Sequence, residues 1–157
     1  MQKMKLSSYP LTANAAATTF EFFSHGPQGT IAKIIQFHLT ETPNLYNLSF
    51  GDLNPTNGEM DDRRRSNNGD HEIVLATIVS AVIMFTVRNP NAWIYAKGST
   101  LSRTRLYQMG IARYRERAIF EFHILAKTQH HWEEFNPGKN YLAFLVFRRK
   151  KNLNFHT

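Results

Sequence analysis

The stretch EIVLATIVSAVIMFTVRNPNAWIYAKGSTLSRTRLYQMG, residues 72–110, indicates a helix, a strand and a second helix in succession. Apolar residues occupy most positions of its first part, so we expect a helix over about 70–88 that is buried on most sides. Asp70 or Asn68 is expected to cap its N-terminus. The ring of Pro90 disfavours helix in the residue before it and ends the helix there.

The rest of this stretch predicts a strand and the second helix. The largely apolar run over 92–97 is typical of a central strand. A helix is expected over about 100–116, with Ser99 or Thr100 as its N-cap. We expect Gly110 to end the main part of this helix, and one or two further helical turns to follow.

Strand patterns lie on both sides of this core. Side chains that alternate between the two faces of a strand, together with the HGPQG turn, predict a β-hairpin over 18–40. Residues 45–53 predict a third strand. Residues 59–66 are read as an edge strand or a loop, 119–127 as a strand, and the turn at 136–140 as the link between the last strands. The order β-β-β-(β)-α-β-α-β-β-β predicts an α+β fold with a mainly antiparallel sheet.

Length and composition set the class of protein. A chain of 157 residues fits a single domain, 1–157, for which we expect flexible tails at residues 1–12 and 150–157. The absence of cysteine excludes disulfides and thiolate zinc sites. We find no run of about 18 apolar residues and no apolar core of a signal peptide, so we expect a cytoplasmic protein without membrane contact.

Charge is unevenly distributed along the chain. The whole chain carries a net charge of +7, but residues 73–157 hold thirteen lysines and arginines against four glutamates. Such a basic half favours an anionic partner. We therefore expect a phosphate-bearing partner, with nucleic acid first among the candidates.

The turn before the second helix is the first candidate for an anion site. We predict that Gly98, Ser99, Thr100, Arg103 and Arg105 bind a phosphate or carboxylate, because free N–H groups at a helix start attract anions and arginines add bidentate contacts. The alternative is that Ser99 or Thr100 only caps the helix while the arginines lie in water.

Two further basic clusters are candidates for contacts with a nucleic-acid backbone. They comprise Arg113, Arg115 and Arg117, and then Arg148, Arg149, Lys150 and Lys151. Such contacts would make binding strongly dependent on salt. The alternative for both clusters is a solvated basic surface.

Aromatic residues and histidines complete the candidates. Trp93, Tyr95 and Tyr107 could stack on bases, although we favour positions in the core for Trp93 and Tyr95. His130 and His131 are adjacent, so on a strand they would point to opposite faces and could not chelate a metal together. We predict neither a metal site nor a cofactor.

Three segments resemble a bacterial protein family. They are SNNGDHEIVLATIVSAVIMFT at 66–86, KGSTLSRTRLYQMGI at 97–111 and GKNYLAFLVFRRK at 138–150. Together they are similar to a domain-of-unknown-function family of short proteins common in Bacteroidota. The resemblance implies a bacterial origin and an intracellular single domain, and it implies no catalytic residues.

A second resemblance concerns the acetyl-CoA-dependent N-acetyltransferase superfamily. Its order of antiparallel strands, helix, strand, helix and two strands is similar to the order expected here, and TRLYQMGI at 104–111 resembles its last helix. The resemblance implies that Tyr107 matches the general acid of that superfamily. Its pyrophosphate loop would correspond to RSNNGDHE at 65–72, where Asp70 and Glu72 place negative charge.

The sequence therefore predicts a small bacterial protein that binds a phosphate-bearing partner, most of all nucleic acid, in a toxin–antitoxin or defence setting. Whether it is an enzyme stays open. The alternatives are an acyltransferase-like enzyme, an enzyme acting on a phosphorylated metabolite, and an interaction module that works as a homodimer or with a partner protein from the same locus.

Overall fold

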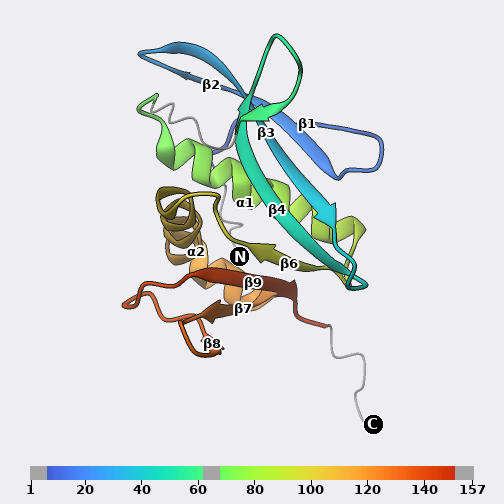
Figure 1. Cartoon of the computed structure of the whole chain (residues 1–157), viewed down its shortest axis with the longest axis vertical. Helices are drawn as coiled ribbons and strands as arrows, with labels where there is room; N and C mark the ends of the chain where they lie inside the picture. Colours follow the sequence, from blue (N-terminus) through green and yellow to red (C-terminus); the bar gives the residue numbers. More distant parts are fainter. Residues whose placement is uncertain (1–6, 62–67, 151–157) are drawn as a thin grey trace, which may run out of the picture.

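Two helices lie against one face of a nine-stranded sheet (Figure 1). The structure is a computed structural model that describes residues 7–61 and 68–150, with only the backbone for 116–120. Its elements are β1 (Thr12–Ala13), β2 (Thr19–Gly26), β3 (Gly29–Leu39), β4 (Leu45–Leu53), β5 (Met60–Asp61), α1 (His71–Arg88), β6 (Trp93–Ala96), α2 (Leu101–Glu121), β7 (Phe122–Lys127), β8 (Trp132–Glu134) and β9 (Ala143–Arg148). The predicted α+β class with two main helices and a mainly antiparallel sheet is confirmed.

The sheet has the order β1-β2-β3-β4-β6-β9-β7-β8, with β5 paired to β4 outside this path. β4 and β6 pair in parallel, and the other pairs are antiparallel. The parallel pairing stops at Leu48 and Ala96, while β4 continues to Leu53. Beyond this point the two strands diverge, as Figure 1 shows.

The core lies between the sheet and α1. Phe20, Phe37 and Phe50 project from β2, β3 and β4 towards the helix, where Phe85 is fully buried. The rings of Phe37 and Phe85 stack with centroids 4.2 Å apart. By length and a mean hydropathy of 1.6, α1 could also cross a membrane, but the core helix of a globular protein meets the same criteria.

The contacts at the start of α1 differ from the helix cap that the sequence predicts. Asp70 occupies the N-cap position but makes no cap hydrogen bond. Its carboxylate accepts hydrogen bonds from the Tyr9 hydroxyl at 2.6 Å and from the Ser24 hydroxyl at 2.5 Å. The Asn68 side chain also contacts the β2–β3 hairpin, because it donates a hydrogen bond to the Gly29 carbonyl at 2.8 Å. The predicted N-cap position of Asp70 is therefore correct, but the expected side-chain cap is absent because the side chains of Asp70 and Asn68 join the β2–β3 hairpin to the helix start.

Tyr9 lies in the segment that we expected to be a flexible tail. Its backbone N–H donates to the Thr77 hydroxyl at 2.9 Å, and its ring stacks on Phe22 with centroids 5.7 Å apart. The described part of this segment, from residue 7 onward, therefore lies against α1. The last predicted tail lies outside the described residues except for Lys150.

α2 extends five residues beyond its predicted end, to Glu121. Gly110 does not end the helix. A Cβ atom at Gly110 would lie 3.3 Å from the Leu75 side chain, so a glycine here permits close approach of α1 and α2. The helix bends at Tyr114, where φ is −104° and ψ is 16°. The prediction that Gly110 ends the main part of α2 was wrong. A glycine is present there because α1 and α2 pack closely, and not because the helix ends.

Candidate functional site

The turn before α2 is packed tightly against the helix that follows it. The Gly98 N–H donates to the Thr104 hydroxyl at 3.0 Å, and Gly98 is buried. A Cβ atom there would lie 2.4 Å from the Thr104 backbone nitrogen. Thr100 accepts a hydrogen bond from the Arg103 N–H at 3.2 Å, which is an N-cap interaction. Ser99 is exposed beside it.

The two arginines of this predicted anion site are directed to different elements. The Arg103 guanidinium lies 4.7 Å from the centre of the Phe50 ring on β4. Arg105 donates to the Tyr141 carbonyl at 3.2 Å, in the segment between β8 and β9. Both side chains therefore have contacts within the fold, and anion binding at this turn stays a prediction.

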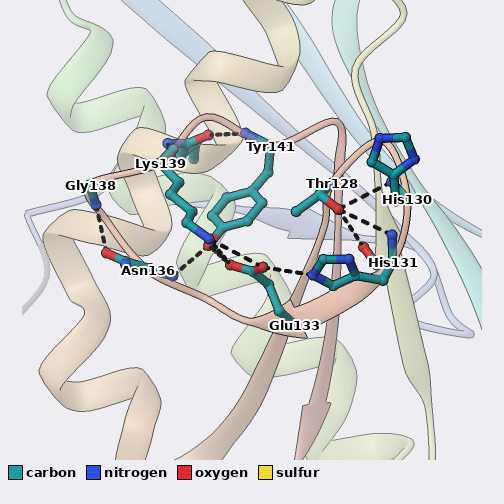
Figure 2. Close-up of polar contacts among 9 residues, drawn as sticks. Thr128, His130, His131, Glu133, Asn136, Gly138, Lys139 and Tyr141 are labelled. Atoms are coloured by element: carbon teal, nitrogen blue, oxygen red, sulfur yellow. Dashed lines mark hydrogen bonds and ion pairs between the residues drawn. The ribbon is translucent and has the colours of Figure 1, made fainter.

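The segment that Arg105 contacts is organised by Glu133 (Figure 2). The Glu133 carboxylate accepts a hydrogen bond from the Tyr141 hydroxyl at 2.8 Å and from the Lys139 ammonium at 3.0 Å, and His131 Nε2 lies 3.0 Å from it. The bonds from Lys139 and Tyr141 lower the pKa of Glu133 to about 2. Gln108 of α2 donates to the Lys139 carbonyl at 2.6 Å, so this network is fixed to the helix.

Several predicted nucleic-acid residues also have partners. Arg148 donates to the Thr86 hydroxyl at 2.9 Å and to the Ile83 carbonyl at 3.2 Å, which ties β9 to α1. Arg113 forms an ion pair with Glu72 at 2.8 Å, with about half of each side chain exposed. Lys150 is exposed. The side chain of Arg117 and all of Lys151 lie outside the described residues.

Three rings form a row across the face of the sheet that the helices leave open. Trp93 of β6, Phe147 of β9 and His123 of β7 are cross-strand neighbours. The Trp93 and Phe147 rings stack with centroids 4.0 Å apart, and those of Phe147 and His123 with centroids 5.1 Å apart. We call these three residues the ring row. Trp93 is 41% exposed, so its expected core position was wrong.

The reason is the alternation of side chains along β6. Ile94 and Ala96 point towards the helices and are buried, which places Trp93 and Tyr95 on the open face. Tyr95 is partly buried, and its ring makes an edge contact with that of Trp132, with centroids 6.2 Å apart. The open face therefore carries aromatic side chains over β6, β9, β7 and β8.

A hollow of about 220 Å³ adjoins the ring row at the edge of β7. Its charged and titratable lining comes from Arg115, His123, Glu134 and Arg149. The Arg149 N–H donates to the Glu121 carbonyl at 2.8 Å, which fixes the backbone beside the hollow. We call this site the β7 hollow. It brings together two predicted nucleic-acid residues, Arg115 and Arg149, from the middle and the end of the C-terminal half.

Comparison with protein families gives a match over residues 5–149, nearly the whole chain. The chain belongs to DUF6934, a family of unknown function. No curated protein and no solved structure matches the chain. Membership of DUF6934 agrees with the predicted resemblance to a family of unknown function, and it leaves the activity to be argued from the site.

In this DUF6934 protein, Tyr107 lies in the interior. It is 5% exposed and lines an apolar cavity of about 90 Å³ between α1, α2 and the sheet. Among the described residues, no group of three or more histidine and acidic side chains could hold a metal ion.

Sequence reasoning missed the ring row, although a signal was present. In WIYAK at 93–97, Trp93, Tyr95 and Lys97 alternate with small or aliphatic residues, and in LVFRR at 145–149 Phe147 and Arg149 occupy alternate positions of the strand pattern. In a strand, residues two apart share a face. Trp93 and Tyr95 therefore share one face of their strand, and Leu145 and Phe147 share one face of theirs. The pairing of β6 with β9, which brings the two sets together, was not visible in the sequence.

Proposed function

We propose that this protein binds single-stranded nucleic acid across the open face of its sheet. The observation that supports the proposal is the ring row beside the β7 hollow. Unpaired bases would stack at the ends of the row, on the ring faces of Trp93 and His123 that Phe147 does not cover, and the phosphates would meet Arg115 and Arg149.

The dimensions of the face suit an unpaired strand. Side chains two residues apart on one strand are about 6.6 Å apart, which is close to the spacing between the bases of an extended single strand. Tyr95 lies one such step from Trp93 on the same face. Base pairs in a duplex bury the faces of their bases in the helical stack, so a ring platform favours unpaired strands.

Charge around the face also suits a polyanion. Lys97 and Lys150 are exposed at the ends of β6 and β9, and Lys127 lies on the open face of β7. Phosphate contacts by such residues release counterions, so affinity is expected to fall steeply as salt rises. On the family resemblance alone, we propose a cytoplasmic bacterial setting and a toxin–antitoxin or defence locus as the context.

Fluorescence anisotropy tests this proposal with labelled single- and double-stranded RNA and DNA at low salt. We expect single strands to bind more tightly than duplexes. Trp93→Ala is expected to weaken binding about tenfold, because one base–ring contact contributes roughly 1–3 kcal/mol. The matched control is Phe23→Ala, since Phe23 is 58% exposed on β2 and lies outside the ring row.

Two results would overturn the proposal. One is the absence of binding to all four nucleic acids at low salt. The other is equal loss of affinity in Trp93→Ala and Phe23→Ala, which would mean that the ring row has no special part in binding. Circular dichroism of both variants shows whether the fold is intact.

A second candidate function is supported by the sheet. The order of antiparallel strands, α1, β6 and α2 agrees with the one that the acetyltransferase resemblance implies, and three strands follow α2 where that superfamily has two. β4 and β6 diverge after Leu48 and Ala96, and both helices begin at that end of the parallel pair. In open sheets, ligands bind beyond the carboxyl ends of parallel strands. We propose acyl-CoA binding there as the alternative.

The alternative has its own test. Acetyl-CoA at millimolar concentration should raise the melting temperature, because a ligand stabilises the state that binds it. Tyr107→Phe should keep this shift and slow any acyl transfer. An unchanged melting temperature would contradict the alternative and leave nucleic-acid binding unaffected.

A further inference from the structure

Among the described residues that line the β7 hollow, Glu134 is the acidic one. It lines the β7 hollow together with Arg115, His123 and Arg149. Its side chain is exposed, and among the residues that the structure describes no hydrogen bond or ion pair engages its carboxylate. A site that served only to attract phosphate would gain nothing from a carboxylate, because the two anions repel each other.

The neighbouring glutamate has a different environment. Glu133 points to the other face of β8, where Tyr141, Lys139 and His131 engage it (Figure 2). That network holds the backbone of β8 in place and leaves Glu134 directed to the open face. The two adjacent carboxylates therefore have separate roles: Glu133 organises the β8–β9 segment, and Glu134 remains available to a ligand.

The strand register places Glu134 close to the ring row. Glu134 is the cross-strand neighbour of Leu125, which lies two residues from His123 on the same face of β7. A base stacked on the ring row and a phosphate at Arg115 or Arg149 would leave the intervening sugar beside the hollow. Glu134 lies on the same wall, so its carboxylate would lie next to that sugar.

The chemistry of a carboxylate limits what it can bind. An ionised carboxylate only accepts hydrogen bonds. Phosphate oxygens likewise only accept, and deoxyribose within a strand has no hydroxyl to donate. Of the groups between a base on the ring row and its phosphate, the ribose 2′-hydroxyl is the donor, and it is the group by which proteins distinguish RNA from DNA.

We propose that Glu134 selects RNA over DNA by accepting a hydrogen bond from a ribose 2′-hydroxyl in the β7 hollow. This inference rests on the proposed function of the open face. It adds the chemical class of the strand and the residue that recognises it. In the absence of the 2′-hydroxyl, Glu134 lies unpaired beside a phosphate backbone and disfavours DNA.

The test compares three strands of one sequence that differ only at the 2′ position: RNA, the 2′-O-methyl form, and DNA with deoxyuridine in place of thymidine. We expect the wild-type protein to bind RNA about tenfold more tightly than the other two, since a hydrogen bond to a charged group contributes roughly 1.5 kcal/mol or more. The 2′-O-methyl strand should behave like DNA because it cannot donate.

Two variants assign the preference to Glu134. In Glu134→Ala we expect the affinity for DNA to rise, because the repulsion is gone, and the ratio of RNA to DNA affinity to fall to about one. Glu41→Ala is the control, since Glu41 is an exposed acid between β3 and β4. It removes the same charge and should leave the ratio unchanged.

The outcomes separate the two proposals. If no strand binds, the proposed function itself fails, and this inference fails with it. If RNA and DNA bind equally, or if Glu134→Ala keeps the ratio of the wild type, the selection of RNA is overturned while single-strand binding stands. A change of base preference in Glu134→Ala that is equal for RNA and DNA would also overturn it, because Glu134 would then contact a base.

Discussion

The arginines at the start of α2 and those around the β7 hollow have the same chemistry but different surroundings. Arg103 lies over the Phe50 ring, and Arg105 donates to the Tyr141 carbonyl. Arg115 and Arg149 line a hollow beside His123 of the ring row. The first pair connects α2 to the sheet and to the β8–β9 segment, and the second pair lines a hollow at the edge of β7.

This difference shows that a basic motif in the sequence does not by itself tell which arginines have contacts within the fold. The segment from Gly98 to Gly110 is the most distinctive in the chain, and most of its side chains have roles in packing. The packing of Gly98 against Thr104 and of Gly110 against Leu75 determines where α2 lies.

The largest effect is expected at Gly98. A Cβ atom in Gly98→Ala would lie 2.4 Å from the Thr104 backbone nitrogen and 2.6 Å from the Arg103 carbonyl carbon, so no side-chain rotation relieves the overlap. We expect a loss of about 3 kcal/mol in the free energy of unfolding, measured with urea. Gly138→Ala is the control and should change it by less than about 0.5 kcal/mol. Unchanged stability in Gly98→Ala would mean that the turn is not packed as described.

Arg105 and Arg115 should separate stability from binding. Arg105→Ala removes a charged donor from the partly buried Tyr141 carbonyl, so we expect a loss of about 1–2 kcal/mol in stability and unchanged affinity for single strands. Arg115→Ala should keep stability within about 0.5 kcal/mol and reduce the slope of log affinity against log salt by about one. Urea unfolding and anisotropy titrations at several salt concentrations measure both.

The reverse pattern would contradict the comparison. If Arg105→Ala weakens binding and leaves stability intact, the anion site predicted at the start of α2 holds, and the β7 hollow loses its assigned role.

The pH dependence of stability reports the Glu133 network. Because the pKa of Glu133 is about 2 in the fold and ordinarily 4.5, its contribution is fully present above pH 4.5 and is lost as pH falls through 2. The melting temperature of the wild type should therefore fall more steeply between pH 5 and 2 than that of Glu133→Gln. Parallel curves for the two proteins would show that Lys139 and Tyr141 do not hold the carboxylate as described.

The smallest effect is expected at the ion pair between Arg113 and Glu72. Both side chains are about half exposed, and such pairs contribute roughly 0–1 kcal/mol. A double-mutant cycle with Glu72→Gln and Arg113→Gln should give a coupling below about 0.5 kcal/mol that disappears in 1 M salt. A larger coupling that persists in salt would place this pair among the interactions that fix α1 to α2.

The sequence by itself determined the class of fold, the two helices and the positions of most strands. The apolar run of α1 and the alternation of inward and outward side chains in β2 and β3 predict these elements, because local periodicity decides which face of an element is buried. Pro90 predicted the end of α1 within two residues. The basic character of the C-terminal half could also be read from composition.

Only the tertiary structure decided the partners of these elements. Gly110 has the local pattern of a helix end, but contact with Leu75 placed it inside α2. Trp93 is as apolar as a core residue, and it became exposed because Ile94 and Ala96 face the helices. The β7 hollow arises from segments that are distant in the chain, and their proximity depends on the insertion of β9 between β6 and β7. Strand pairing is a non-local property, and no single stretch of sequence encodes it.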